Sequence, residues 1–92
     1  KIPDYATNNA HMFYLVFESI SDRTNFINHL KENEILSVFH YLSLHSSPYY
    51  FDKHDGRKLI YTDRYTNCLL RLPLFYELDP KKVTNALRSF NF

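Results

Sequence analysis

The sequence predicts a single α+β domain, in which helices pack on a small sheet. Three segments, residues 11–17, 36–42 and 69–75, are rich in the aromatic and aliphatic side chains expected of strands. Segments between and after them place apolar residues at helical spacing. Ninety-two residues fit one domain, and eight Tyr with eight Phe are enough to fill one core.

Composition argues against several classes of protein. The net charge of +1 disfavours nucleic acid and anionic membranes as partners, because these usually require a basic face. No apolar run approaches the ~20 residues of a membrane span. A single glycine, Gly56, excludes the glycine-rich loops of dinucleotide-binding and P-loop domains. The lone Cys68 has no internal disulfide partner, which fits a reducing cytoplasm.

The first strand is expected to be covered on both faces. Residues 1–10 are polar and contain Pro3, so they are interpreted as a linker, and the start at Lys1 instead of Met suggests a cut from a longer protein. Residues 11–17 are then apolar at nearly every position, whereas a half-exposed strand would alternate. A neighbouring domain or subunit would supply the second cover.

The first helix is expected over residues 21–35. Ser21 is a plausible N-cap, and Asp22 in the first turn complements the helix dipole. The apolar face consists of Phe26, Ile27 and Leu30. A second strand follows at residues 36–42.

A long loop is expected after this strand. It contains Pro48, the three adjacent aromatics Tyr49, Tyr50 and Phe51, and the turn pair Asp55-Gly56. Exposed, these aromatics would form an interaction surface; we expect at least two of them to pack beneath the loop.

The last two helices flank the third strand. Thr62 and Asp63 predict a short helix through about Leu69. Residues 69–75 are extended, and Pro73 belongs at an edge or a strand end because it lacks an N–H. Asp79 followed by Pro80 is a typical helix start. The final helix then repeats apolar residues at Val83, Ala86, Leu87 and Phe90.

Metal and nucleophile chemistry are both disfavoured by spacing. His40, His45 and His54 lack the close-spaced pair typical of zinc ligands, even with Asp52 or Asp55 added. Cys68 lies in an apolar run, where cysteine usually acts as a small buried hydrophobe. His45 adjoins two serines, Ser46 and Ser47, but neighbours on an extended chain point to opposite sides.

The remaining polar cluster, His40, Tyr41 and His45, has two interpretations. In one, His40 and Tyr41 lie at a strand end, one packed inward and one facing solvent. In the other they contact a ligand, because strand ends and the loops after them usually display such groups. Arg71 alternates with leucines, so it either faces solvent, which is favoured, or pairs with an anion.

These segments, in this order, resemble part of a known enzyme family. The blocks that carry the resemblance are NAHMFYLVF, DRTNFINHLKENEI, VFHYLSLHSSP, DRYTNCLLRLPLFYEL and DPKKVTNALRSF. They are similar to the C-terminal part of the PLP-dependent DegT/DnrJ/EryC1/StrS sugar-nucleotide aminotransferases. Because several ordered blocks match together, the resemblance is specific at the level of the family.

The resemblance implies the small C-terminal domain of PLP fold type I, a mostly antiparallel sheet with helices packed on it, over residues 11–92. Residues 1–10 would link it to a large domain carrying the Schiff-base lysine, the aspartate facing the pyridine nitrogen and the phosphate-binding loop. That domain would also cover part of the first strand. None of the lysines outside the family's lysine motif is proposed as catalytic, namely Lys31, Lys53, Lys58, Lys81 and Lys82.

The same resemblance implies an activity and its partners. The intact enzyme, a cytoplasmic homodimer, would convert a dTDP-4-keto-6-deoxyhexose to the 4-amino sugar, with PLP as cofactor and glutamate as donor. This fragment alone would be inactive. The family pattern of His-Tyr, two residues, Leu-His, two residues, Pro implies that His40, Tyr41 and His45 bind the substrate. No cofactor or metal ligand is assigned, and residues 49–61 stay unassigned.

A different class of function remains open. The chain would then be a free-standing α+β interaction module that docks a partner through residues 49–51. Such a module would be a stable 92-residue protein with no upstream sequence.

Overall fold

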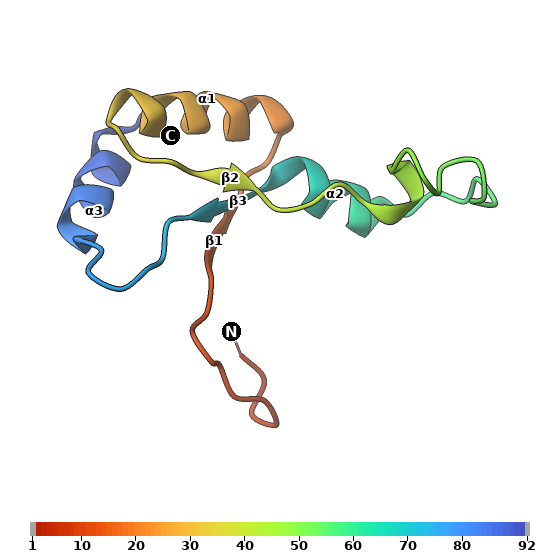
Figure 1. Cartoon of the computed structure of the whole chain (residues 1–92), viewed down its shortest axis with the longest axis horizontal. Helices are drawn as coiled ribbons and strands as arrows, with labels where there is room; N and C mark the ends of the chain where they lie inside the picture. The colour runs from red at the N-terminus through yellow and green to blue at the C-terminus, as the bar shows by residue number, and fades with distance from the viewer. Residues whose placement is uncertain (1, 92) are drawn as a thin grey trace.

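A computed structural model describes residues 2–91 and shows the α+β architecture that the sequence predicts. In chain order its elements are β1 (Phe13–Val16), α1 (Ile20–Glu32), β2 (Val38–Phe39), the short 3₁₀ turn η1 (Leu44–Ser46), α2 (Ile60–Cys68), β3 (Leu69–Leu72) and α3 (Pro80–Ser89) (Figure 1). Within the described residues, no helix is both long and apolar enough to cross a membrane.

The sheet has β3, its last strand in sequence, at its centre. The strand order is β1-β3-β2, and both pairings are antiparallel. On β3, Arg71 lies opposite Tyr14 of β1 and Val38 of β2. Pro73 follows the last residue of β3, so the prediction of a strand-end proline is confirmed.

Helices α1 and α3 pack on one face of the sheet and enclose the core. Phe26 and Leu30 of α1 and Leu70 of β3 are 0% exposed, and Val83 and Ala86 of α3 complete the same cluster. The Phe26 ring also contacts two other aromatic rings of the core, with centroids 5.2 Å and 4.9 Å away. The predicted apolar faces of both helices are therefore confirmed.

The cap of α3 was predicted correctly and the cap of α1 was not. Asp79 accepts a hydrogen bond from a backbone N–H in the first turn of α3 (2.9 Å), with Pro80 at the first helical position. The N-cap of α1 is Ser19, whose Oγ accepts from the backbone N–H of Asp22 (3.1 Å). Ser21 already lies inside the helix, because the chain turns into α1 two residues earlier than expected.

The second strand and the middle helix also differ from the prediction. Residues 36–42 were expected to form a strand, but β2 contains only Val38–Phe39. It pairs with two residues of β3, Leu70 and Arg71, whereas β1 pairs with all four. Helix α2 begins at Ile60, before the predicted cap at Thr62, and Asp63 lies in its first turn.

The first strand is present but is not covered on both faces. Tyr14 and Val16 of β1 are 50% and 40% exposed. They lie opposite Arg71 and Leu69 on β3, and Leu15 alternates with them and packs against the core. Among residues 2–91, α1 and α3 cover only one face of β1. Cover of the other face by a neighbouring domain or subunit stays a prediction.

Residues 43–59, here called the extension, project from the rest of the domain (Figure 1). Apart from η1 they form turns and loop, as predicted. The expected packing of the aromatics is wrong, because Tyr49 and Phe51 are 75% and 64% exposed. The radius of gyration is 15.7 Å, compared with about 12 Å for a compact chain of this length.

Candidate functional site

The predicted site begins where β2 ends. His40 and Tyr41 follow the last paired residue of β2, and their rings are in contact, with centroids 4.5 Å apart and planes 59° apart. His40 is half-buried, whereas Tyr41 is 66% exposed. This is the arrangement expected of a strand end, with one side chain inward and one outward.

His40 and Tyr41 also line two cavities, one on each side of them. The larger, about 630 Å³, opens on the sheet face away from α1 and α3, and Arg71, Val38 and Pro73 contribute to its walls. The smaller, about 220 Å³, lies against α2 and has polar groups on its wall, from Ser43, Thr62, Tyr65 and Thr66. The same two residues therefore line both cavities, one with basic side chains on its wall and one with hydroxyl-bearing side chains.

Arg71 stands on the central strand at the wall of the larger cavity. Its guanidinium carbon lies 5.5 Å from the centroid of the Tyr41 ring, within the range of a cation–π contact. The side chain is half-buried, in contrast to the solvent-facing position favoured from the sequence. Its Nε is buried without a hydrogen-bond partner, and so is Nδ1 of His40. Two polar groups at this site therefore lack partners within residues 2–91.

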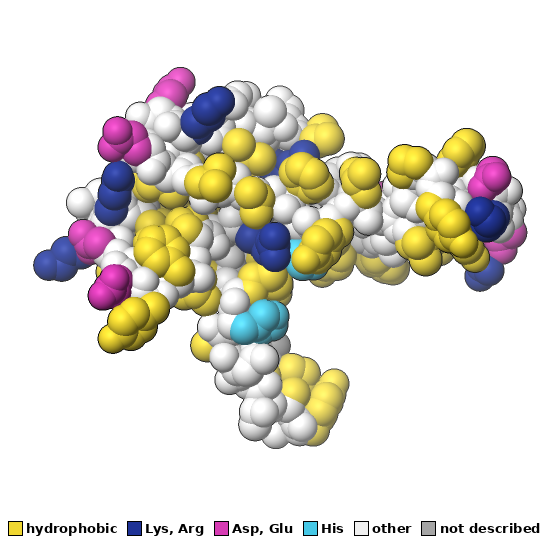
Figure 2. All heavy atoms as spheres, viewed as in Figure 1, with side chains coloured by type: hydrophobic (Ala, Val, Ile, Leu, Met, Phe, Trp, Pro, Cys, Tyr) yellow, Lys and Arg dark blue, Asp and Glu magenta, His cyan; other side chains and the backbone are white. Residues whose placement is uncertain are grey.

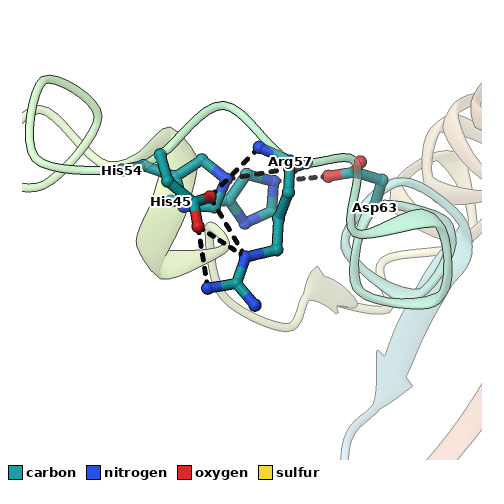
Figure 3. Close-up of polar contacts among 5 residues, drawn as sticks. His45, His54, Arg57 and Asp63 are labelled. Atoms are coloured by element: carbon teal, nitrogen blue, oxygen red, sulfur yellow. Dashed lines mark hydrogen bonds and ion pairs between the residues drawn. The ribbon is translucent and has the colours of Figure 1, made fainter.

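His45 lies in the extension and has a different neighbourhood. Its Nε2 is 2.7 Å from Oδ1 of Asp63, a contact that joins η1 to the first turn of α2 (Figure 3). The His45 ring also contacts the His54 ring, with centroids 5.2 Å apart. His45 lines neither cavity of the His40–Tyr41 site. The structure thus brings His40 and Tyr41 together and places His45 with Asp63.

Asp55 and Arg57 form a local clamp at the tip of the extension. Both Nε and a terminal nitrogen of Arg57 lie 2.8 Å from Oδ2 of Asp55, and the backbone N–H of Arg57 donates to Oδ1 (3.1 Å). The hydrogen bonds from the side chain and backbone of Arg57 lower the pKa of Asp55. The side-chain hydrogen bond to the Asp55 carboxylate raises the pKa of Arg57. His54 Nε2 lies 3.0 Å from the Arg57 carbonyl oxygen. The clamp orders a surface turn and lines no cavity described above.

The structure also places the side chains considered above for metal binding and for nucleophilic catalysis. Among residues 2–91, His, Cys, Asp and Glu side chains form no group of three or more that could hold a metal ion. Cys68 is buried, as predicted, and its Sγ lies 3.9 Å from the carbonyl oxygen of Glu18. The hydroxyl of Ser46 contacts that of Ser43. Its neighbour His45 is engaged by Asp63 instead.

A comparison with models of protein families shows which family the chain matches. The model of the DegT/DnrJ/EryC1/StrS aminotransferase family matches residues 2–91. The chain belongs to this family. The match spans every helix and strand described above.

Members of this family depend on PLP, and the cofactor requires a lysine side chain that residues 2–91 do not provide at this site. No lysine lines either cavity beside His40 and Tyr41. Lys82 lies 3.4 Å from Glu34, and Lys53 lies 4.1 Å from the Tyr49 ring centroid, in the extension. The described part of this aminotransferase chain therefore does not fit PLP by itself, and no chemical step is assigned to it through the cofactor.

Two site residues were not predicted from the sequence. Asp63 is 18 positions from His45, and it was interpreted only as a helix cap. Arg71 was noted, but its contact with Tyr41 depends on how β2 and β3 align. A histidine and an acid at such a separation carry no local signal, so only the folded chain reveals the pair.

Proposed function

We propose that this chain is the C-terminal small domain of a PLP-dependent sugar-nucleotide aminotransferase. Residues 1–10 would link residues 11–92 to a large domain that carries the cofactor lysine. The observation that carries the proposal is the family match over residues 2–91. The exposed apolar face of β1 supports it, because a second domain would cover that face.

The proposed substrate is a dTDP-4-keto-6-deoxyhexose. The product would be dTDP-4-amino-4,6-dideoxygalactose, with glutamate as amino donor, for cell-surface polysaccharide such as enterobacterial common antigen. The basis is the resemblance of the ordered sequence blocks to the enzymes that make this sugar. The full-length protein would act as a cytoplasmic homodimer.

The proposed substrate-binding residues are His40, Tyr41 and His45. His40 and Tyr41 line both cavities, where an aromatic ring and a ring nitrogen suit a sugar with an apolar face and hydroxyl groups. Asp63 engages Nε2 of His45, so Nδ1 is the nitrogen left to contact substrate. PLP, held by the large domain, would carry the amino group between donor and keto sugar, and these side chains would orient the sugar.

The test uses the chain joined to its large domain. Replacing His40 or Tyr41 by Ala should lower kcat/KM for the keto sugar by about tenfold or more, since each lost contact leaves a polar group unpaired. PLP content, measured by absorbance, should not change. Tyr76→Ala is the matched control, because Tyr76 is 92% exposed and lines none of the cavities described here.

Two outcomes would contradict the proposal. Normal turnover in both the His40 and Tyr41 variants would reduce the stretch to a strand end without a substrate role. Stable trapping of PLP on a lysine of the isolated 92-residue chain by borohydride would contradict the location of the cofactor lysine outside it.

A second candidate function is supported by the exposure of Tyr49 and Phe51. As an interaction module, the chain would dock a partner through residues 49–51. Figure 2 shows hydrophobic side chains clustered on the extension as well as over the sheet. An upstream large domain in the encoding reading frame favours the aminotransferase, and a start codon immediately before Lys1 favours the module.

A further inference from the structure

The single glycine of the chain, Gly56, directly follows Asp55 at the exposed tip of the extension. The Asp55 side chain is 55% exposed. Gly56 has no side chain to shield its backbone nitrogen, and its φ of 80° is a conformation that residues with a Cβ rarely adopt. This pair therefore joins a side-chain carboxyl group to an unhindered backbone nitrogen.

The backbone N–H of Gly56 has no hydrogen-bond partner among residues 2–91. Asp52, earlier in the extension, provides a comparison, because its side chain is also exposed. The residue after it, Lys53, donates its backbone N–H to the carbonyl oxygen of Tyr50 (2.9 Å). Of these two nitrogens, only that of Gly56 is free to react with the side chain before it.

A free backbone nitrogen can attack the side-chain carboxyl carbon of the aspartate before it. In this step the Gly56 nitrogen forms a bond to Cγ of Asp55, while its proton and the carboxyl hydroxyl leave together as water. The product is a cyclic succinimide. Water then opens the ring: addition at Cγ restores Asp55, and addition at the main-chain carbonyl carbon gives isoaspartate. Neither step needs an oxidant or a reductant, and water is the only other reactant.

Arg57 opposes this reaction through its contacts with Asp55. Its Nε lies 2.8 Å from Oδ2, and its backbone N–H donates to Oδ1 (3.1 Å). These hydrogen bonds from its side chain and backbone lower the pKa of Asp55, so they favour the carboxylate. The carboxylate is the unreactive form, because the protonated carboxyl group is the one that can release its hydroxyl as water. The clamp therefore slows the attack.

We propose that Asp55-Gly56 is a site of spontaneous isoaspartate formation, and that the Arg57 clamp controls its rate. The proposal is supported by the exposed carboxyl group, the unpartnered Gly56 N–H and the contacts of Arg57. It does not depend on the aminotransferase activity, since every residue in it belongs to the extension. The modification lengthens the backbone by a methylene group and moves the carboxylate away from Arg57.

Isomerisation should also alter the surroundings of His45. Nε2 of His54 lies 3.0 Å from the carbonyl oxygen of Arg57, and the His54 and His45 ring centroids are 5.2 Å apart. A longer backbone between His54 and Arg57 displaces that carbonyl group, so NMR resonances of both histidine rings should shift. The thermal unfolding midpoint of the rest of the domain should stay the same, because the extension buries no apolar side chain.

The experiment follows the folded 92-residue chain during incubation in mildly acidic buffer. Samples are digested with an endoproteinase that cleaves before aspartate but not before isoaspartate, and the fragments are identified by mass spectrometry. Cleavage before Asp55 should decline with time, whereas cleavage before Asp52 should persist. Isoaspartyl methyltransferase should transfer methyl groups from S-adenosylmethionine to the peptide that contains residue 55.

Three variants isolate the clamp and the ring closure. Arg57→Ala should speed the loss of cleavage before Asp55 severalfold, because a larger fraction of the carboxyl group is then protonated. Arg64→Ala removes an equal charge from α2, away from the clamp, and should leave the rate unchanged. Asp55→Glu should abolish methylation of the peptide, because the longer side chain has to close a larger ring. Circular dichroism checks that each variant is folded.

Three results would overturn the proposal. Persistent cleavage before Asp55 in both the parent chain and Arg57→Ala would exclude the modification site. Equal rates in these two chains would refute control by the clamp. Loss of cleavage before Asp52 at the same rate would show that exposure alone decides the reaction, and not the free N–H of Gly56.

Discussion

Two regions of this domain are held together by different interactions. The body, formed by the sheet with α1 and α3, buries Phe26, Leu30 and Leu70 completely. The extension, residues 43–59, buries no apolar side chain, and its polar contacts mostly join residues two to four positions apart. The exception is the contact between His45 and Asp63, 18 positions apart.

This comparison indicates which residues determine the stability of the domain and which can affect the site alone. Burial of apolar surface is the larger free-energy term, and exposed polar contacts contribute much less. His40 and Tyr41 lie at the junction, fixed from the body side by β2, whereas His45 belongs to the extension. Changes in the extension should therefore alter the site without unfolding the body.

The largest effect is expected from Phe26→Ala in the body. Removal of a fully buried ring that contacts two others should lower the free energy of unfolding by about 3–5 kcal/mol. That is a large part of the ~5–14 kcal/mol expected for a domain of this size. Urea denaturation followed by circular dichroism measures it.

The matched control is Phe51→Ala in the extension. Its ring is exposed, so the free energy of unfolding should change by about 0.5 kcal/mol or less. Equal destabilisation by the two substitutions would mean that the extension packs against the body in solution, and the distinction between the two regions would fail.

A smaller effect separates the observed cap of α1 from the predicted one. Ser19→Ala should destabilise the body by about 1 kcal/mol, because the backbone N–H of Asp22 loses its acceptor. Ser21→Ala should be close to neutral, since Ser21 lies inside the helix, where Ala is favoured. The midpoints of urea denaturation of the two variants, compared with the parent chain, provide the measurement. A larger loss from Ser21→Ala would restore the sequence-based assignment of the cap.

The body was largely predictable because its signals are local. The Asp79-Pro80 start and the apolar spacing of Val83, Ala86 and Leu87 describe α3, although Phe90 follows the helix as its C-cap. Phe26 and Leu30 were expected on one buried face. The length of β2 was not predictable, because it depends on how β2 aligns with β3, a segment about 30 positions away in the sequence.

The site was predictable only in part, for the same physical reason. His40 and Tyr41 are neighbours in the sequence, and the sequence also predicts their position at a strand end. The contact of Arg71 with Tyr41 and that of Asp63 with His45 arise from pairing and packing between distant segments. The exposed aromatics of the extension were misjudged because nothing in the sequence shows that no element passes beneath them.

The smallest effect tests whether the tip of the extension acts independently of the body. Hydrogen bonds from Arg57 hold the pKa of Asp55 below its ordinary value of 3.8. Because the folded-state pKa is depressed, the clamp contributes its stability above pH ~4 and loses it as the pH falls through the lowered pKa. Carbon NMR of the Asp55 carboxyl group should show this titration, and Arg57→Ala should return the pKa of Asp55 toward 3.8.

The thermal unfolding midpoint of the body at neutral pH should be the same with and without Arg57, because both side chains of the clamp are exposed. A fall in that midpoint would show that the extension supports the body, and an unshifted Asp55 in the parent chain would show that the clamp does not form.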